Sequence, residues 1–291
     1  MQDRIDVTVS VVNWNTREEL RGCVESVLAQ DGSVSFELIV VDNASSDESA
    51  EMIAANFENR VTLIANNENR GFGAAHNQSI ARSRGRYVFL VNPDARMIEG
   101  DVLAKMVAFM DANPNIGMIG PKVLNRDGTL QYSARRYPTM LASAMRHTML
   151  GRLFPNNRYV RKYLMTDWNH DQISDVDWLS GSALMVRREA FEQIGVLDEG
   201  FFMYCEDVDW CKRAHIGGWR VVYYPETSVS HKIGAASDQI AIPMIKQHHK
   251  SALRYFFKYN SRSPRILLTP LILLALWWRS RSLIRLARKG G

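Results

Sequence analysis

The sequence predicts an α/β protein built on a mostly parallel sheet that helices cover on both faces. Short runs rich in β-branched residues alternate with segments of helical periodicity. These runs are apolar almost throughout, as expected of strands buried on both faces, and each ends in polar residues. The chain has 291 residues, of which 46% are hydrophobic and 23% charged, so it can bury a substantial core.

The alternation is regular in the first third of the chain. The segment 18–30 places Leu20, Val24 and Val27 at helical spacing, between two β-branched runs. A strict alternation of strands and helices is typical of a parallel sheet. Strands are expected at 7–12, 36–41, 61–65 and 87–91, and helices at 18–30, 47–57 and 73–83.

Polar residues follow each predicted strand. Asn13 and Asn15 come after the first strand, Asp42 after the second, and the segment 66–70 after the third. Ligands of such sheets bind outside the carboxyl ends of the strands, so a crevice is expected there. A carboxylate at the position of Asp42 can accept hydrogen bonds from a base N–H or a sugar hydroxyl.

A glycine pair, Gly71 and Gly73, lies between the third strand and the next helix. One interpretation is a plain tight turn. The other is a loop that lets the backbone approach a diphosphate, with Arg70 supplying charge and Asn77 one turn into the helix. The loop alone favours neither.

The fourth strand ends in Asn92-Pro93-Asp94. A hard divalent cation prefers oxygen ligands, and one carboxylate together with a diphosphate and a second protein ligand can hold it. On its own, this motif is more typical of a turn that ends the strand, with Asp94 solvated.

Three carboxylates, Glu206, Asp207 and Asp209, directly follow the aromatic segment 201–204. Clustered acids beside apolar surface raise one another's proton affinity, which is typical of a tuned base or of a site for a cation. On a helix that begins near Glu206, Glu206 and Asp209 share one face and Asp207 points elsewhere. If Glu206 or Asp209 caps the helix or pairs with Arg213, Asp207 is left for a ligand; the alternative is a capped helix without chemistry.

These motifs occur in a fixed order between residues 7 and 235. They are Asn13-Trp14-Asn15, Asp42-Asn43-Ala44-Ser45, Asn69-Arg70-Gly71-Phe72-Gly73, Asn92-Pro93-Asp94, Gly181-Ser182-Ala183, Glu206-Asp207-Val208-Asp209 and His231. In this order the chain resembles glycosyltransferase family 2, whose inverting members have the GT-A fold, and is most similar to bacterial rhamnosyltransferases of cell-envelope polysaccharide synthesis.

The resemblance implies a role for each motif. Asn92 stands where the family's Asp-x-Asp motif has its first acid, which puts the choice of metal in doubt. The implied roles are nucleotide-sugar binding for Asn13, Asn15, Asp42, Arg70, Gly71, Asn77 and Asn92, binding of Mg²⁺ or Mn²⁺ for Asp94 and His231, general base for Asp207, and acceptor binding for Trp178, Gly181, Ser182 and Glu206. For Trp178, a core aromatic is an equal alternative.

The implied reaction is inverting transfer of a sugar from a nucleotide sugar to a lipid-linked, polyprenyl diphosphate saccharide. The resemblance points to dTDP-L-rhamnose as the donor, and UDP-galactose and UDP-N-acetylglucosamine are alternatives. A nucleotide-sugar binding protein without catalysis is a further alternative, which would not need Asp207.

Positive charge is concentrated at the end of the chain. Without this tail, 29 basic and 31 acidic residues remain, so the net charge of +5 does not indicate a nucleic-acid binder. The basic residues of the tail, which has no acidic residue, are Arg262, Arg265, Arg279, Arg281, Arg285, Arg288 and Lys289.

The apolar segment 266–278 precedes most of this charge and ends in Trp277 and Trp278. A spanning helix needs about 20 apolar residues, and Pro270 interrupts this segment near its start. The sequence therefore predicts a helix in the membrane interface, with the alternative of a helix packed on the protein's own core.

The expected organisation is a catalytic domain at 1–240, with a nucleotide-sugar half at 1–125 and an acceptor half at 126–240, followed by a helical membrane-association tail at 241–291. The charged N-terminus indicates no signal peptide. Cys23, Cys205 and Cys211 have neither zinc nor disulfide spacing, which favours a reduced compartment. The expected location is the cytoplasmic face of the membrane, as a peripheral protein.

Overall fold

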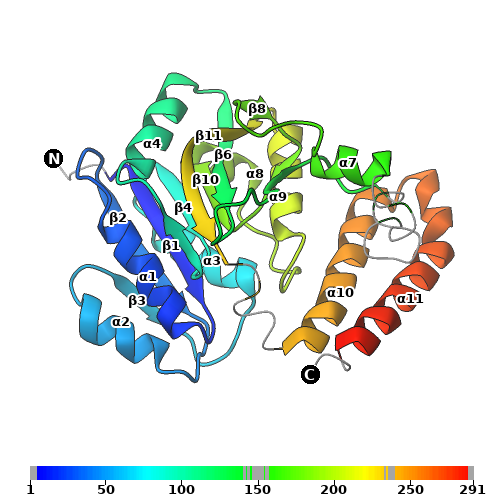
Figure 1. The fold of residues 1–291 in the computed structure, drawn as a ribbon, viewed down its shortest axis with the longest axis horizontal. Helices are drawn as coiled ribbons and strands as arrows, with labels where there is room; N and C mark the ends of the chain where they lie inside the picture. Colours follow the sequence, from blue (N-terminus) through cyan, green and yellow to red (C-terminus); the bar gives the residue numbers. More distant parts are fainter. Residues whose placement is uncertain are drawn as a thin grey trace.

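A nine-stranded mixed sheet forms the centre of the molecule (Figure 1). The computed structural model describes residues 5–139, 157–232 and 240–287, and the single positions 142, 145, 154 and 234. The strand order is β3-β2-β1-β4-β10-β6-β11-β5, with β8 beside β11. The strands are β1 (Val7–Asn13), β2 (Phe36–Asp42), β3 (Thr62–Ala65), β4 (Tyr87–Val91), β5 (Ala95–Met97), β6 (Ile116–Leu124), β8 (Ser174–Asp175), β10 (Ala183–Arg187) and β11 (Arg220–His231).

Helices cover both faces of this sheet. One buried cluster includes Leu20 of α1, Met52 of α2 and Met106 of α4, and a second includes Ile80 of α3 and Trp210 of α9. The body helices are α1 (Arg17–Leu28), α2 (Ser49–Phe57), α3 (Phe72–Arg82), α4 (Val102–Ala112), α7 (Arg158–Leu164), α8 (Arg188–Ile194) and α9 (Glu206–Ile216).

The first four strands confirm the predicted parallel arrangement. β3, β2, β1 and β4 all pair in parallel, and every residue of β1 and β4 is buried. The continuous apolar runs in the sequence reflect this burial.

The second half of the sheet is mixed. β10 is antiparallel to both β4 and β6, and β11 is parallel to β6 but antiparallel to β5 and β8. A separate two-stranded sheet pairs β7 (Ala134–Arg135) with β9 (Trp178–Leu179). Because β10 lies between β4 and β6, the segments 1–125 and 126–240 share one sheet.

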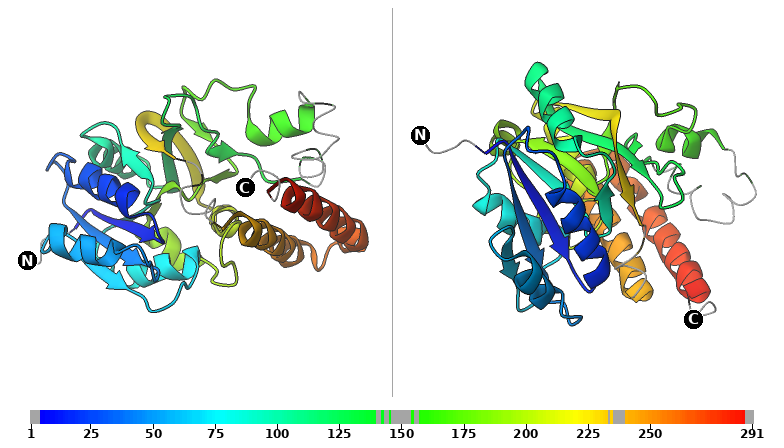
Figure 2. Two further views of the ribbon diagram at one scale, coloured as in Figure 1. Left: turned by 60° about the horizontal axis from the view of Figure 1, so that its bottom comes forward. Right: turned by 60° about the vertical axis from the view of Figure 1, so that its left-hand side comes forward.

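Two long helices follow the sheet and lie side by side at one end of the molecule, running in opposite directions (Figures 1 and 2). They are α10 (Ala241–Asn260) and α11 (Thr269–Ala287), joined through a short 3-10 helix at Pro264–Leu268. We call α10, this turn and α11 the C-terminal hairpin. Arg288 and Lys289 of the predicted basic tail lie outside the described residues.

The apolar segment 266–278 continues from the 3-10 helix into α11 without a break at Pro270. Pro270 lies at the first turn of α11, where a proline fits, so it does not interrupt the helix. Pro264–Arg285 spans 22 residues, and an 18-residue window of it has a mean hydropathy of 1.3, which by length and composition is enough to cross a membrane. Leu271, Leu274 and Trp278 are each more than half exposed.

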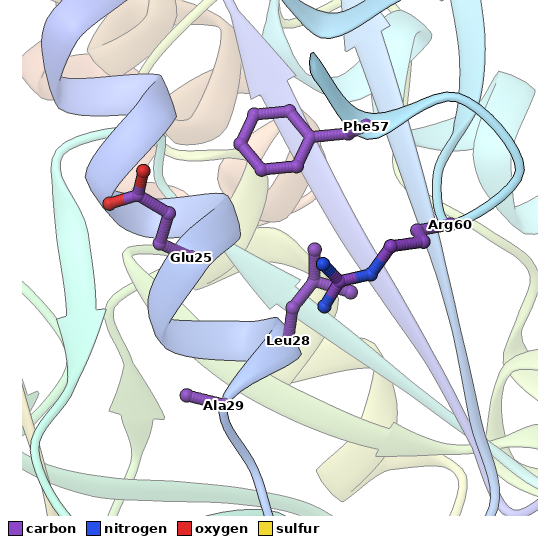
Figure 3. A pocket seen from close by; sticks show the side chains of 5 residues that line it. All are labelled: Glu25, Leu28, Ala29, Phe57 and Arg60. Carbon is purple, nitrogen blue, oxygen red and sulfur yellow. The ribbon is translucent and has the colours of Figure 1, made fainter.

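A shallow pocket of about 180 Å³ lies between α1 and the end of α2 (Figure 3). It is lined by Glu25, Leu28 and Ala29 with Phe57 and Arg60. Glu25, Leu28 and Ala29 lie at the C-terminal end of α1, and Phe57 and Arg60 lie at and just after the C-terminal end of α2. The pocket is thus on the side of the sheet where the parallel strands begin, opposite their carboxyl ends. The pocket is therefore separate from the polar strand ends.

Candidate active site

The mixed topology brings three distant polar segments to the same strand ends. Val91 pairs with Ala183, so Asn92 lies beside Ser182 and its N–H donates to the Ser182 carbonyl at 3.0 Å. His231 pairs with Ala95, which places the imidazole beside Asp94. The strand order thus joins residues 92–94, 181–182 and 231 into one site.

At the end of β1 and β2, Asn13 and Asp42 are both buried and bonded to each other. The Asn13 amide donates to Asp42 Oδ1 at 2.9 Å and to Ser45 Oγ at 3.0 Å. The Ser45 N–H donates to Asp42 Oδ2 at 2.9 Å. Each carboxylate oxygen keeps a further lone pair, so Asp42 is held in one orientation and can still accept a hydrogen bond.

Asn15 has a left-handed backbone, with φ of 53°, just after β1. Its Oδ1 accepts from the Ser46 N–H at 2.7 Å, and its own N–H donates to Ser45 Oγ at 2.9 Å. In the free protein, Asn15 therefore fixes the loop after β2, and its predicted contact with the nucleotide stays a prediction.

The loop 69–73 is attached to the segment that precedes α9. The Phe72 N–H donates to the Phe202 carbonyl at 2.8 Å. Gly71 has φ of 85°, and a Cβ there would lie 2.4 Å from the Phe202 carbonyl oxygen. This close backbone approach explains Gly71 without a ligand.

Two other residues of this loop region have different surroundings. The Asn77 side chain makes two hydrogen bonds with the backbone of Leu197. Its Nδ2 donates to the Leu197 carbonyl at 2.9 Å, and its Oδ1 accepts from the Leu197 N–H at 3.1 Å. Asn77 thus joins α3 to the segment before α9, which differs from the predicted contact with the donor. The Arg70 side chain is exposed, and its predicted role stays a prediction.

Asp94 and His231 face each other at 3.1 Å, from Oδ1 to Nε2. Gln131 Oε1 lies 2.7 Å from His231 Nδ1, and the Gln131 amide nitrogen donates to Asn125 Oδ1. This orientation of Gln131 makes Nδ1 the protonated nitrogen, so Nε2 is an acceptor, and the Asn92 amide nitrogen also lies 3.1 Å from it.

A divalent cation fits these atoms. Among the described residues, Asp94 Oδ1 and Asn92 Oδ1 are buried without a hydrogen-bond partner. Two acceptors that face each other across 3.1 Å, as Asp94 and His231 do, repel unless a cation or proton lies between them. In the described part of the chain, no cluster of three or more His, Cys, Asp or Glu side chains is positioned to bind a metal. A metal at this site therefore also needs oxygens from a bound diphosphate or from water.

Asp207 lies in the first turn of α9, and backbone donors hold both of its oxygens. Oδ1 accepts from the Val208 N–H at 2.8 Å and Oδ2 from the Gly181 N–H at 3.1 Å. Burial raises the pKa of Asp207, although these donors and the charge of Arg135 act in the opposite direction. A raised pKa makes the carboxylate a better proton acceptor near neutral pH.

The three acids of this cluster have different surroundings. Burial, together with the charge of Asp207, raises the pKa of Glu206 well above 4.5, and Glu206 Oε2 has no partner among the described residues. Asp209 is fully buried and bonds Arg213 Nε at 2.9 Å, which confirms the predicted pairing. Only Asp207 combines partial exposure with contact to the 181–182 turn.

The predicted acceptor residues divide between core and site. Trp178 is 5% exposed, its Nε1 donates to the Arg136 carbonyl at 2.9 Å, and the Arg135 guanidinium lies 5.0 Å from its ring. The structure thus favours the core alternative for Trp178. Ser182 is buried, and its Oγ has no partner within the described residues.

Sequence reasoning missed Gln131 and did not connect Arg135 with Asp207. Gln131 fixes the tautomer of His231, and no pattern in the sequence marks it. Arg135 is the positive charge that acts on Asp207. Since both lie about 70 or more residues from their partners, only the fold reveals these contacts.

Glu206→Gln is expected to stabilise the protein increasingly as pH rises. The pKa of Glu206 in the folded protein is raised above its ordinary value of 4.5. The folded protein therefore holds this proton more tightly than the unfolded chain does, and stability is lost as pH rises from the ordinary value through the folded pKa. Glutamine removes this dependence. Thermal unfolding between pH 4.5 and 9 measures it, with the exposed Glu68→Gln as control; a variant whose advantage does not grow with pH contradicts the prediction.

Comparison with known proteins identifies the family. The Glycosyl transferase family 2 profile matches residues 8–195. The N-acetylglucosaminyl-diphospho-decaprenol L-rhamnosyltransferase of Mycobacterium tuberculosis is 32% identical over 264 residues, which cover 87% of this chain and 80% of the relative. Rhamnosyltransferase WbbL of Escherichia coli is 27% identical over 205 residues, covering 67% and 73%.

Solved structures share the fold at low sequence identity. The mannosyltransferase PcManGT of Pyrobaculum calidifontis, in complex with GDP-Man and Mn²⁺, has a TM-score of 0.57 at 19% identity, covering 100% of this chain and 77% of that one. S. aureus TarS 1–349 has a TM-score of 0.56 at 15% identity, covering 96% and 83%. The family match and this architecture lead to one conclusion: the chain belongs to glycosyltransferase family 2 and has the GT-A fold.

Proposed function

We propose that this protein transfers L-rhamnose with inversion from dTDP-L-rhamnose to a saccharide linked to polyprenyl diphosphate, in cell-envelope polysaccharide synthesis. The proposal rests on one observation: the turn at 181–182 contacts both Asp207, through the Gly181 N–H, and the strand end that carries Asp94, through the Ser182 carbonyl. Asp94 in turn faces His231. The similar rhamnosyltransferases support the choice of sugar and acceptor.

The residues of the site fit the steps of inverting transfer. Asp207, held by two backbone N–H groups, takes the proton from the acceptor hydroxyl as the hydroxyl attacks the anomeric carbon. Asp42 and Asn13 bind the base and ribose and so place that carbon. Asp94 and His231 would hold Mg²⁺ or Mn²⁺, which when bound stabilises the negative charge of the leaving diphosphate.

The hairpin supports a membrane-bound acceptor. Its α11 exposes Leu271, Leu274 and Trp278, and Arg281 lies 4.0 Å from the Trp277 ring. Paired tryptophans beside arginines are typical of the level of lipid headgroups. We place the protein at the cytoplasmic membrane surface through α11, with α10 between this helix and the catalytic body.

A transfer assay tests the proposed reaction. Purified protein is given a short-chain alkyl-diphospho-N-acetylglucosamine with dTDP-L-rhamnose, UDP-galactose or UDP-N-acetylglucosamine. We expect transfer from dTDP-L-rhamnose and from neither UDP-sugar. The anomeric configuration of the transferred sugar, determined by NMR, should be opposite to that in the donor. A thermal shift with dTDP-L-rhamnose but no turnover would instead support the non-catalytic alternative.

Replacing Trp277 and Trp278 together by alanine is expected to weaken binding to anionic vesicles about tenfold or more, because burying one large apolar side chain contributes about 1.5–3 kcal/mol. Flotation with vesicles measures the bound fraction. Ile216→Ala, at a residue 72% exposed on α9, is the matched control. Equal binding of the double variant and the control would refute the assignment of α11 to the membrane.

A further inference from the structure

The helix that carries Asp207 is bonded to the C-terminal hairpin. Asp209, two residues beyond Asp207, is fully buried and receives two contacts from the end of α10. Lys258 Nζ lies 2.7 Å from Asp209 Oδ1, and the Tyr259 hydroxyl donates to the same oxygen at 2.7 Å. Together with Arg213 on Oδ2, these contacts pair a charge that is otherwise costly to bury.

A second set of contacts holds the segment just before α9. Tyr204 and Cys205 both have φ of 69°, a left-handed conformation that is strained for residues other than glycine and persists only where the surroundings impose it. Ser251 of α10 donates to the Met203 carbonyl at 2.7 Å, and the Tyr204 ring lies 5.2 Å from the ring of His248.

Lys258 bonds both Asp209 of α9 and Asp198, which lies before the segment 203–205. Besides Asp209, its Nζ bonds Asp198 Oδ2 at 2.6 Å, and Arg254 bonds Asp198 Oδ1 at 2.9 Å. Hydrogen bonds with Lys258 and Arg254 lower the pKa of Asp198 to about 2, against the effect of burial, so this carboxylate is charged at neutral pH. One lysine thus fixes both ends of the segment 198–209.

We propose that α10 positions the catalytic base, with Lys258 and Tyr259 acting through Asp209 to fix the first turn of α9. The contacts that hold the Asp207 carboxylate come from the Val208 and Gly181 N–H groups, so its orientation depends on the position of the first turn of α9. A displacement of about 1 Å at such a position can cost on the order of a hundredfold in rate. The inference rests on the proposed role of Asp207.

It follows that the two helices of the hairpin have separate tasks. α11 exposes the apolar face proposed for the membrane, whereas α10 contacts the base-bearing segment. Loss of membrane binding and loss of turnover should then be separable by substitution.

Full-length Lys258→Met and Tyr259→Phe test the proposal with the short-chain acceptor, at temperatures well below unfolding. We expect kcat to fall about tenfold or more in Lys258→Met, with the donor KM within twofold. Lys258→Arg should have a kcat close to that of the native protein, because arginine keeps the positive charge at this position. Lys250→Met, an exposed lysine of the same helix, is the matched control, and the Trp277, Trp278 double variant should keep its kcat.

Hydrogen exchange gives a readout that needs no turnover. We expect the amides of residues 209–211 to exchange faster in Lys258→Met than in Lys250→Met. If the native protein transfers no sugar, the proposed reaction fails while faster exchange still supports the α10 contact. Unchanged kcat with unchanged exchange would overturn the inference, as would a loss confined to KM.

Discussion

Asp207→Asn is expected to reduce kcat by about a thousandfold or more while the affinity for dTDP stays within about twofold. An amide of the same shape can keep one of the two backbone hydrogen bonds, from Gly181 or from Val208, but cannot accept the proton of the acceptor hydroxyl. General base catalysis contributes typically 10²–10⁴-fold. Asn13 and Asp42, which we propose bind the nucleotide, lie on β1 and β2 and remain in place.

Initial rates of transfer and calorimetric titration with dTDP measure the two quantities. Asp167→Asn, at an exposed aspartate, is the control. Turnover above about a tenth of the native value would mean that another group takes the proton. A parallel loss of dTDP binding would mean that the substitution disturbs the fold of the site rather than its chemistry.

The pH dependence of kcat gives a further test of the same residue. Burial raises the pKa of Asp207 above its ordinary value of 3.8. The base must be ionised, so kcat should fall as pH falls through this raised value, and the acidic limb should lie above the ordinary pKa range of an aspartate. Glu206 interacts strongly with Asp207, so the apparent pKa belongs to the pair.

Asp94→Ala is expected to abolish metal-dependent stabilisation and to reduce transfer by at least a hundredfold. The substitution removes the buried oxygen that faces His231 at 3.1 Å. A divalent cation contributes several kcal/mol of charge stabilisation in reactions of this type. Thermal shift with Mn²⁺ and dTDP, compared with dTDP in EDTA, detects loss of the metal without any turnover.

His231→Ala should give the same loss, and Gln131→Ala a smaller one because the imidazole then keeps its position but not its tautomer. Asp101→Asn, a partly exposed aspartate before α4, is the control. If Asp94→Ala retains the full thermal shift with Mn²⁺ and dTDP, the metal lies elsewhere.

Much of the first half of the fold follows from the sequence. The apolar runs of β1 and β4 are buried in full, and the predicted helix 18–30 is α1, Arg17–Leu28. Such elements are determined by local periodicity and burial. The family motifs also identified the residues that the structure gathers at Asp94, His231 and Asp207.

Other assignments depended on packing that no local pattern encodes. Trp178 is a core residue, Asn77 bonds Leu197, and Gly71 allows Phe202 to approach. Each of these contacts joins positions at least 40 residues apart, or 120 in the case of Asn77. The effect of Pro270 was also misjudged, because a proline in the first turn of a helix does not end it.

The sequence by itself determined the family, the order of strands and helices in the first third of the chain, and the types of residue needed for sugar transfer. Only the tertiary structure decided which of the three acids faces the 181–182 turn. Helical spacing separates Asp207 from Glu206 and Asp209, but burial and partners distinguish them: Asp209 bonds Arg213 and Lys258, while backbone donors hold Asp207. The reason is physical, since a carboxylate's role depends on solvent, charges and donors brought from distant parts of the chain.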